Sequence, residues 1–276
     1  MTGSRWRLRL GTREIEAGLP DSPVLSEFLD RLTFAQASVL LLDYDGTLAP
    51  FRMERDRAYP YPGVVSLLEQ IVNRKKTRTV IISGRPVAEV KDLLSPLNGI
   101  EMWGAHGLER ISADGIYQQA PIPWNALELL SKARDWVIKA NLIPLAEVKP
   151  GGIAIHWRGM PQIEVDEVEA RLMSGWALIA ESPELKLLQF ESGLELRVAH
   201  PDKGNAVEAI MEESGSTAEI AYLGDDLTDE DSFQALNGHG LTVLVRPEYR
   251  QTAAQLWIRP PGELIEFLQQ WLSRIR

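Results

Sequence analysis

The sequence contains no cysteine. This absence excludes disulfide bonds, zinc sites built on cysteine and catalysis by a cysteine nucleophile. Histidine is also scarce: four occur in 276 residues, at positions 106, 156, 200 and 239, and none lies in an HExxH pattern. Glycine-rich dinucleotide and Walker motifs are absent as well. These absences leave carboxylate chemistry as the main option for a catalytic function.

Long apolar runs and an excess of basic residues are also missing. The chain has no apolar run of about 18 residues, so no membrane-spanning helix is expected. Residues 5–16 are too charged for a signal peptide, and we expect a cytoplasmic protein. The net charge of -10 argues against nucleic acid or an anionic membrane as the main partner. The expected partner is a small molecule, while the oligomeric state stays open.

Two aspartates follow the apolar run 39–42, which reads as a buried parallel strand. Residues 43–48 are Asp-Tyr-Asp-Gly-Thr-Leu. Because side chains alternate along a strand, Asp43 and Asp45 should lie on one side of the chain, and Gly46 then frees the backbone to turn. Two carboxylates at the end of a core strand cost stability unless they are used. They could bind a divalent cation, accept a phosphoryl group or carry a proton.

The apolar spacing predicts alternating helices and strands in both terminal parts of the chain. The expected helices lie at about 23–33, 64–72, 87–95, 203–213 and 262–274, and the expected buried strands at 39–42, 79–82, 100–103, 220–223 and 241–245. Alternation of this kind predicts an α/β fold whose core is a doubly wound parallel sheet.

The pattern changes in the middle of the chain. An amphipathic helix is expected at about 125–140 and another at about 163–174, with strands at 153–157, 186–190 and 193–198. We therefore predict two domains. Residues 1–112 and 199–276 form the α/β core, and residues 113–198 form an inserted α+β domain.

Four polar signals lie where core strands end. They are Asp43 with Asp45, the triplet Ser83-Gly84-Arg85, the pair Lys203-Gly204, and the acidic run 224–231. Ligands of open α/β sheets bind beyond the carboxyl ends of the strands, so all four signals could meet there. Each signal alone has an ordinary interpretation as a turn, a helix cap or a solvated helix start. Together they offer a nucleophile, groups that hold phosphoryl oxygens, and acidic ligands for Mg2+.

In this order and spacing the signals resemble the haloacid dehalogenase superfamily of aspartate-nucleophile phosphotransferases, from about residue 35 to 270. The resemblance implies Asp43 as the nucleophile and Asp45 as the general acid and base. It also implies that Ser83, Gly84 and Lys203 bind phosphate. The inserted domain falls where this superfamily carries a C2-type cap.

The same resemblance implies Mg2+ as the cofactor. Its ligands would be Asp43, the backbone carbonyl of Asp45, and Asp225. Asp226 and Asp229 would support these ligands or lie on the metal side.

Further motifs resemble those of trehalose-6-phosphate phosphatases. Residues 104–109 are similar to the pattern GxHGxE, residues 224–233 match GDDxTDExxF, and residues 147–158 resemble ExKxxxxxxHYR with tryptophan in place of tyrosine. The resemblance implies hydrolysis of trehalose 6-phosphate to trehalose and phosphate through an aspartyl-phosphate intermediate. It also implies a set of residues on the sugar side: Arg85, His106, Glu109, Glu147, Lys149, His156, Arg158 and Glu195.

The chain departs from this pattern at one place. The family usually has Gly-Lys shortly before a strand with the pattern ExR. Here residues 195–197 match ExR, but Phe190-Glu191 stands where Gly-Lys is expected. Another sugar or glycoside phosphate, such as sucrose phosphate or a glucosylglycerol phosphate, is therefore an alternative substrate. A non-catalytic sugar-phosphate sensor is a third hypothesis, although the broken motif expected of a sensor is not found.

Overall fold

The computed structural model describes residues 8–9, 14–19, 22–52, 54–190 and 193–275. The chain forms two compact units. The first unit comprises Met1–Tyr117 and Lys203–Arg276, and the second comprises Gln118–Asp202. Glu191, at which the sequence departs from the family pattern, lies outside the described residues.

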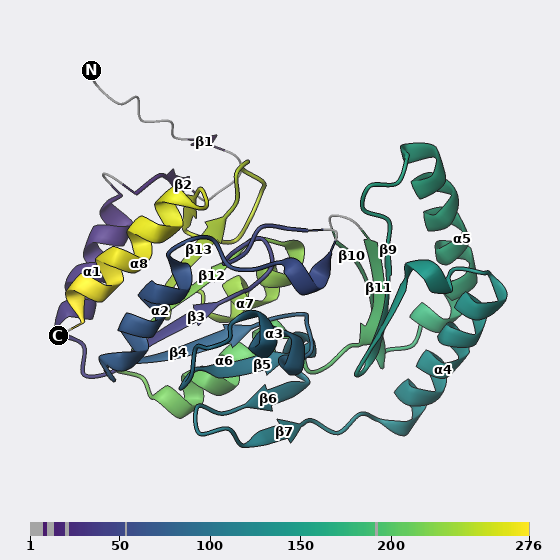
Figure 1. Cartoon of the computed structure of the whole chain (residues 1–276), viewed down its shortest axis with the longest axis horizontal. Helices are drawn as coiled ribbons and strands as arrows, with labels where there is room; N and C mark the ends of the chain where they lie inside the picture. Colours follow the sequence, from purple (N-terminus) through teal and green to yellow (C-terminus); the bar gives the residue numbers. More distant parts are fainter. Residues whose placement is uncertain (1–7, 10–13, 20–21, 53, 191–192, 276) are drawn as a thin grey trace. The chain divides into compact units, whose positions relative to one another are not determined.

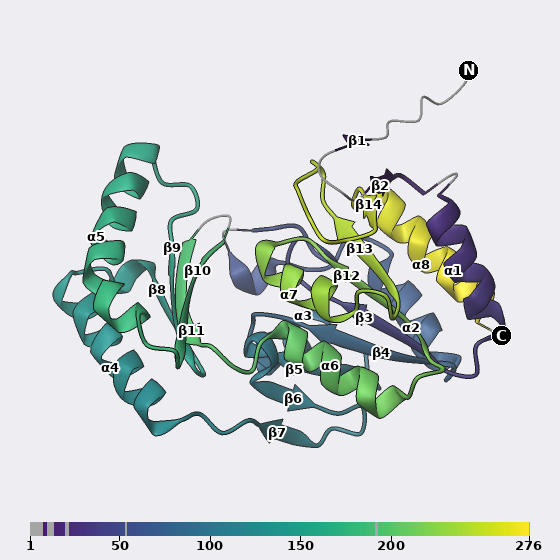
Figure 2. The same cartoon turned by 180° about the vertical axis from the view of Figure 1, so that it is seen from behind.

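One sheet organises the first unit (Figures 1 and 2). In the described residues its order is β1-β2-β14-β13-β12-β3-β4-β5-β6-β7. The strands are β1 (Leu8–Arg9), β2 (Glu14–Ala17), β3 (Ser38–Leu42), β4 (Thr77–Ile82), β5 (Glu101–Gly104), β6 (Glu109–Ile111), β7 (Tyr117–Gln119), β12 (Glu219–Gly224), β13 (Leu241–Val245) and β14 (Leu256–Ile258). All neighbours from β2 to β5 are parallel, whereas β1 and β6 pair antiparallel at the two sides. The predicted parallel core is confirmed.

Helices cover both faces of this sheet. They are α1 (Pro23–Phe34), α2 (Val64–Asn73), α3 (Val87–Leu93), α6 (Lys203–Ser214), α7 (Glu230–Ala235) and α8 (Gly262–Arg274), with short 3-10 turns η1 (Arg55–Arg57), η2 (Ala105–Gly107) and η4 (Leu227–Asp229). Apolar residues of α1, α2, α3 and α8 pack on one face, and those of α6 and α7 pack on the other. This arrangement is the doubly wound fold that the sequence predicts.

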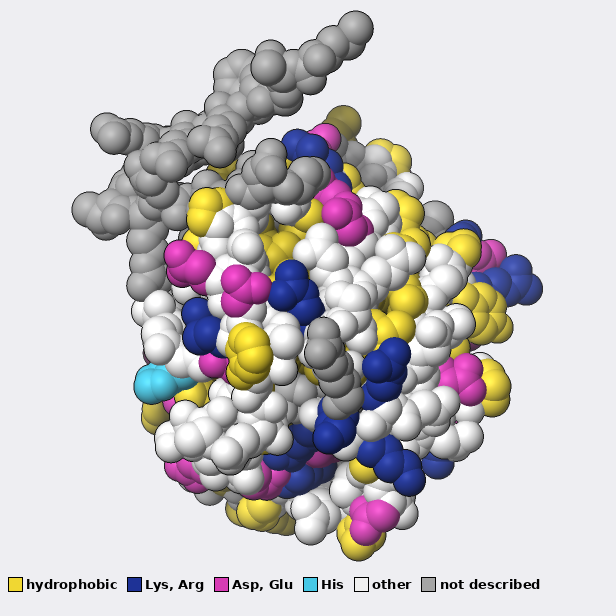
Figure 3. Space-filling view, turned by 90° about the vertical axis from the view of Figure 1, so that its left-hand side faces the viewer, with side chains coloured by type: hydrophobic (Ala, Val, Ile, Leu, Met, Phe, Trp, Pro, Cys, Tyr) yellow, Lys and Arg dark blue, Asp and Glu magenta, His cyan; other side chains and the backbone are white. Residues whose placement is uncertain are grey.

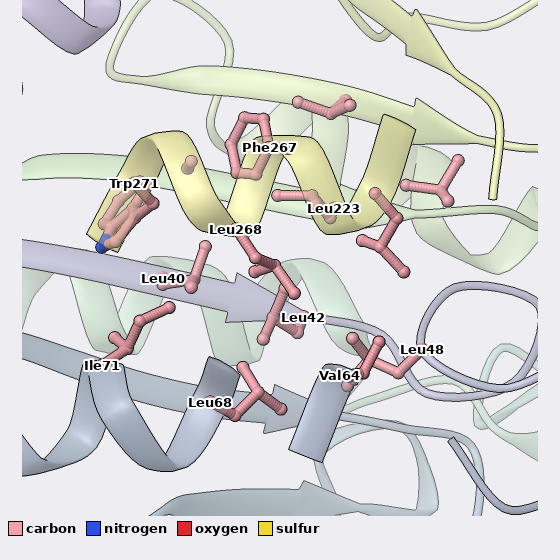
Figure 4. Packing of buried hydrophobic residues seen from close by; sticks show 14 of the residues in the cluster. Leu40, Leu42, Leu48, Val64, Leu68, Ile71, Leu223, Phe267, Leu268 and Trp271 are labelled. Carbon is pink, nitrogen blue, oxygen red and sulfur yellow. The ribbon is translucent and has the colours of Figure 1, made fainter. Parts of the chain in front are cut away.

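The central strand β3 is buried on both faces, which explains its unbroken apolar sequence. Leu40 and Leu42 point into the core shared with α2 and α8, whereas Val39 and Leu41 point into the core shared with α6 (Figure 4). Trp271 of α8 is fully buried in the first of these cores, and its indole N–H donates to Thr77 Oγ1 at 3.1 Å. The two layers hold β3 rigidly, and its carboxyl end carries Asp43.

The second unit is an antiparallel sheet with two long helices. The sheet order is β10-β11-β9-β8, with β8 (Ala146–Lys149), β9 (Gly152–His156), β10 (Leu185–Phe190) and β11 (Gly193–Val198). The helices are α4 (Trp124–Lys139) and α5 (Gln162–Ala180), and η3 (Ile143–Leu145) precedes β8. Both α4 and α5 contact strands of this sheet.

The sequence analysis ended α5 too early and missed β8. Helix α5 continues past Gly175, so this glycine does not end the helix. It serves helix packing instead: a Cβ at position 175 would lie 2.0 Å from the ring of Trp136 in α4. Strand β8 is an edge strand of four residues. Because short edge strands are often polar, the sequence carries only a weak apolar signal there.

Charged residues of both signs are interspersed over the face shown in Figure 3. Ion pairs also join elements of the first unit, such as Arg31 with Glu219 and Arg274 with Asp30. Among the described residues, no helix has the length and apolar content needed to cross a membrane.

The packing around α8 predicts a large loss of stability for Trp271→Ala. We expect the free energy of unfolding to fall by about 3–5 kcal/mol, because the substitution leaves a cavity in a close-packed core. Trp271→Phe should cost less, since most of the ring volume remains. Chemical denaturation measures both. Phe34→Ala is the control, because Phe34 is 86% exposed and should change stability by less than about 0.5 kcal/mol. Equal effects at positions 34 and 271 would contradict this account of the core.

Candidate active site

Three neighbouring strands bring the motifs of the first unit together. Strand β3 lies between β12 and β4 in the sheet, and all three are parallel. Asp43 follows β3, Asp225 follows β12 and Ser83 follows β4, so the three residues lie at one edge of the sheet. The backbone N–H of Asp43 donates to the carbonyl of Leu223 at 2.8 Å and extends the pairing of β3 with β12. The sheet register therefore positions the acidic residues.

Lys203, the first residue of α6, joins the early and late motifs. Its ammonium nitrogen lies 2.6 Å from Asp43 Oδ1 and 2.7 Å from Asp229 Oδ1. All three side chains are at most 5% exposed. Burial alone would lower the pKa of the Lys203 ammonium, but the two carboxylates raise it well above its ordinary value. Lys203 is therefore a fixed positive charge between two aspartates.

Asp229 is the most fully hydrogen-bonded carboxylate of the cluster. Oδ1 accepts from the Lys203 ammonium and from the Tyr222 hydroxyl at 2.6 Å. Oδ2 accepts from the backbone N–H groups of Asp225 and Asp226, each at 2.9 Å. Although burial raises the pKa of Asp229, these donors outweigh it and hold the pKa below the ordinary value. Asp229 thus fixes the lysine and the loop after β12.

The pKa values of Asp43 and Asp225 are raised, whereas that of Asp229 is lowered. Burial is the largest cause that raises the pKa of Asp43 to about 7, and the charge of Asp229 adds to it while Lys203 opposes it. Burial and the neighbouring charges of Asp43 and Asp229 raise the pKa of Asp225 well above its ordinary value. One carboxylate oxygen from each of these three aspartates lies within 4.8 Å of the others. Three carboxylates share the Lys203 ammonium, and the Arg246 guanidinium lies 3.9 Å from Asp225 Oδ2. Full ionisation of this buried cluster is therefore costly.

Gly46 permits the close approach of Asp225. It has a φ of +81°, which side chains rarely adopt, and a Cβ there would lie 2.1 Å from Asp225 Oδ2. The other oxygen, Asp225 Oδ1, is buried and has no hydrogen-bond partner among the described residues. Hard cations bind oxygen ligands. A buried carboxylate oxygen without a hydrogen-bond partner, next to other carboxylates, is suited to bind such a cation.

Asp45 is held by Arg85 rather than by the lysine. The guanidinium Nε lies 2.6 Å from Asp45 Oδ2, and Nη2 lies 2.7 Å from Oδ1. Arg85 also donates to the carbonyl of Arg55 at 2.9 Å and has a side-chain exposure of only 5%. A two-pronged contact of this kind fixes the carboxylate plane of Asp45. The sequence analysis placed Arg85 on the sugar side, and its observed partner is the predicted acid and base.

Ser83, Gly84 and His106 form one packed group. The Ser83 hydroxyl accepts from the backbone N–H of Arg85 at 3.1 Å, and the backbone N–H of His106 donates to the carbonyl of Ser83 at 3.0 Å. A Cβ at Gly84 would lie 2.6 Å from the His106 ring. Because Gly84 has no side chain, the His106 imidazole can pack directly against its backbone.

Glu109 stabilises the local fold. One of its oxygens accepts from the backbone N–H of Val87 at 3.0 Å, which is the first residue of α3, and the other accepts from the Tyr117 hydroxyl at 2.8 Å. Asp226 has a similar role at η4, where its side chain accepts from the backbone N–H of Leu227 at 2.8 Å. Helix starts favour such acceptors.

Sequence reasoning missed residues that hold the loop after β12. Arg250 donates to the carbonyl of Asp225 at 3.1 Å and to that of Asp226 at 2.6 Å, and it forms an ion pair with Glu230. Arg246 donates to the Asp225 carbonyl at 3.3 Å. Both arginines lie after β13 in a stretch without a recognisable motif, so only the fold shows their role.

The second unit carries the remaining predicted residues. Glu147 and Lys149 lie on β8, His156 on β9 and Glu195 on β11, while Arg158 follows β9. The register pairs Ala154 with both Glu147 and Glu195, so their side chains share one face of the sheet.

Two hydrogen-bonded pairs form on this face. Lys149 Nζ lies 3.0 Å from Glu195 Oε1, and His156 Nε2 lies 2.8 Å from Glu147 Oε2. The opposite face is apolar, with Ile153, Ile155 and Leu196 buried. Four of the five predicted residues of this unit therefore belong to one polar surface.

Structural comparison defines the class of protein first. The structure is similar to a haloacid dehalogenase-like hydrolase from Bacillus subtilis, with a TM-score of 0.61 and 16% identity over 84% of this chain and 99% of that one. It is also similar to the C-terminal domain of Candida albicans trehalose-6-phosphate phosphatase, with a TM-score of 0.76 and 20% identity over 93% and 99% of the two chains. The fold is that of the haloacid dehalogenase-like hydrolases.

Sequence comparison defines the family. The trehalose-phosphatase family model matches residues 41–255, so the chain belongs to the trehalose-phosphatase family. It is 29% identical to a trehalose-phosphate phosphatase of Mycobacterium ulcerans over 98% of this chain and 70% of that protein. It is 31% identical to a probable trehalose-phosphate phosphatase C of Arabidopsis thaliana, over 84% and 76% of the two. The predicted family and the enzyme class, a phosphoric monoester hydrolase, are confirmed.

The raised pKa of Asp43 predicts a pH-dependent stability of the metal-free protein. The folded pKa of about 7 lies above the ordinary 3.8, so the folded state binds the proton more tightly and loses stability as the pH rises through this range. We expect Asp43→Asn to stabilise the chelator-treated protein at pH 8, by on the order of 2 kcal/mol, and to have a smaller effect at pH 5.

Chemical denaturation at both pH values measures this difference. Asp30→Asn is the control, because Asp30 is an exposed partner of Arg274 and should show little pH-dependent change. A substitution at position 43 that destabilises more at pH 8 than at pH 5 would show that Lys203 outweighs the burial of the carboxylate.

Proposed function

We propose that this chain is a Mg2+-dependent phosphatase that hydrolyses trehalose 6-phosphate to trehalose and phosphate through an aspartyl-phosphate intermediate. The buried cluster of Asp43, Asp225, Asp229 and Lys203 at the carboxyl edge of the parallel sheet carries this proposal. Membership of the trehalose-phosphatase family supports the choice of substrate.

The reaction has two phosphoryl transfers. A carboxylate oxygen of Asp43 attacks phosphorus, the bond from phosphorus to the sugar oxygen breaks, and Asp45 gives a proton to the leaving alkoxide. Water then attacks the phosphorus of the aspartyl phosphate, Asp45 takes a proton from that water, and the bond from phosphorus to Asp43 breaks. Asp43 is regenerated, and phosphate leaves.

Arg85 controls the carboxylate that carries this proton. Its two donors occupy both oxygens of Asp45. Protonation removes the negative charge of Asp45 and turns one of its oxygens into a donor, so the contact with Arg85 weakens when Asp45 carries the proton. Arg85 keeps the carboxylate in place through both steps, while the Ser83 hydroxyl, the backbone at Gly84 and the Lys203 ammonium provide donors for phosphoryl oxygens.

The residues present fit a divalent cation. Asp43 and Asp225 are buried carboxyls with raised pKa values, and Asp225 Oδ1 is a buried acceptor without a hydrogen-bond partner among the described residues. Asp43, Asp225 and the backbone carbonyl of Asp45 would hold Mg2+, with Asp229 and Asp226 fixing the loop around them. When bound, Mg2+ would supply positive charge for phosphoryl oxygens.

The polar surface of the second unit is assigned to the sugar. Its two pairs, Lys149 with Glu195 and His156 with Glu147, offer donors and acceptors that suit hydroxyl groups. Arg158 follows β9 of the same sheet. In the first unit, the residues proposed for the sugar side are Arg85, His106 and Glu109. The second unit thus corresponds to the cap, and the first to the catalytic core.

The function is tested by phosphate release from purified protein. Trehalose 6-phosphate, sucrose phosphate, a glucosylglycerol phosphate and glucose 6-phosphate are compared, each with and without Mg2+. We expect Mg2+-dependent release with the highest kcat/KM on trehalose 6-phosphate. Better turnover of another sugar phosphate would overturn the substrate, and binding without any release would favour a sensor.

Asp43→Asn should abolish turnover, because the amide is a poor nucleophile and the uncatalysed hydrolysis of phosphate monoesters is extremely slow. Steady-state phosphate release measures the loss, and circular dichroism checks that the protein is folded. A variant that retains a substantial rate would remove Asp43 from the role of nucleophile.

Asp45→Asn should lower kcat by roughly 10²- to 10⁴-fold, the usual contribution of a positioned acid and base. The comparison with Asp43→Asn separates the two aspartates, since only loss of the nucleophile should be near total. Indistinguishable losses would argue against the separate roles.

Lys149→Ala should reduce kcat/KM for trehalose 6-phosphate more than for a small aryl phosphate, because only the sugar substrate needs the polar surface of the second unit. The matched control is Lys132→Ala, since Lys132 is exposed on α4 and pairs with Glu128 of the same helix. Equal losses on both substrates would show that Lys149 does not read the sugar.

A further inference from the structure

An aromatic ring lies on the polar face of the second unit, at the place where the family pattern has glycine. The register pairs Phe190 of β10 with Gly193 of β11, and Gly193 with His156 of β9. These three residues therefore form one row across three strands on the same face. The next row contains Glu195, Ala154 and Glu147, so the ring borders the hydrogen-bonded pair of His156 with Glu147.

The missing side chain of Gly193 gives the ring its position. A Cβ at position 193 would lie 2.1 Å from the Cζ atom of Phe190, so the ring occupies the space above the glycine. The ring centroids of Phe190 and His156 are 5.3 Å apart, with an interplanar angle of 61°. Phe190 is only half-buried. The two rings meet in a tilted, T-shaped arrangement and are not stacked face to face.

The neighbours of this ring have the chemistry that a sugar ring needs. A pyranose has faces rich in C–H groups and a rim of hydroxyls. The C–H groups pack on a flat apolar surface, and the hydroxyls need paired donors and acceptors. Phe190 supplies the flat surface, and the His156–Glu147 pair beside it supplies polar atoms. Gly193 and Ala154, which lie on the same face, have little side-chain volume and leave room beside the ring.

We propose that Phe190 is a specificity-determining residue on which a sugar ring of the substrate stacks. The proposal rests on the assignment of this polar face to the sugar. Under this proposal, an apolar contact from Phe190 supplies part of the binding that the lysine of the family pattern would supply. A disaccharide phosphate with an exposed C–H face is the class of substrate that benefits.

A purely structural role is the competing explanation, because an aromatic side chain that covers a glycine of the neighbouring strand also stabilises a sheet. The two roles differ in what they require. Stacking of a sugar requires a flat ring, whereas covering the glycine requires only apolar bulk. KM for a substrate without a sugar ring should depend on neither the presence nor the shape of the Phe190 side chain.

The test compares Phe190→Ala, Phe190→Leu and Phe190→Tyr in the full-length protein with Mg2+. KM and kcat are measured for a panel of sugar phosphates that includes trehalose 6-phosphate, and for acetyl phosphate, which has no ring. We expect the alanine and leucine variants to raise KM for the best sugar phosphate about tenfold, and the tyrosine variant to retain it. KM for acetyl phosphate should not change.

The controls separate stability from recognition. Phe34→Ala, at an exposed position of α1, should leave KM for every substrate unchanged. Thermal unfolding identifies variants that lose stability, and the ratio of KM for sugar phosphate to KM for acetyl phosphate is unaffected by a smaller folded fraction. If alanine, leucine and tyrosine give the same ratio as the wild type, the proposal is wrong even when they lower the melting temperature.

The outcome also separates this proposal from the assignment of trehalose 6-phosphate. A wild-type preference for a different sugar phosphate overturns that assignment. The KM ratio for the preferred sugar still decides the role of Phe190, because the stacking face requires a ring and not one particular disaccharide.

Discussion

The catalytic edge of the first unit depends on one buried ammonium among three buried carboxylates. Lys203 offsets Asp43 and Asp229 directly, and the residual negative charge falls on Asp43 and Asp225, whose pKa values are raised. Burial makes these carboxylates costly to ionise, and a bound cation would offset that cost. The same charge balance supports the proposed Mg2+ site and the proposed role of Asp43 at the end of β3.

Rigid support explains how four segments distant in sequence act as one site. The two-sided burial of β3 fixes Asp43, and four donors fix Asp229. Two prongs of Arg85 fix Asp45, and Arg250 holds the backbone of the loop that bears Asp225. Each side chain that we propose for catalysis therefore has a partner that positions it, which is the preorganisation that phosphoryl transfer requires.

The two faces of the sheet in the second unit differ in character. One face packs its apolar residues beneath α4 and α5, and the other presents paired polar residues with a single aromatic ring at one end. Because alternate residues of a strand face opposite ways, both functions fit into the same four strands. The buried apolar side chains lie on the other face, so an exchange of residues on the polar face leaves the core intact.

The sequence alone determined the α/β class, the parallel core, the motifs of the catalytic edge and the family, because buried strands and the polar residues that end them leave local patterns. It did not reveal β8, the full length of α5 or the contacts of Arg246 and Arg250. Strand β8 is a short polar strand at the edge of its sheet, the length of α5 depends on its contact with α4, and the two arginines lie in loops without motifs. Only the tertiary structure decided which partner each charge meets. Arg85, Glu109 and Asp229 have several possible partners in sequence, and long-range packing selected one arrangement.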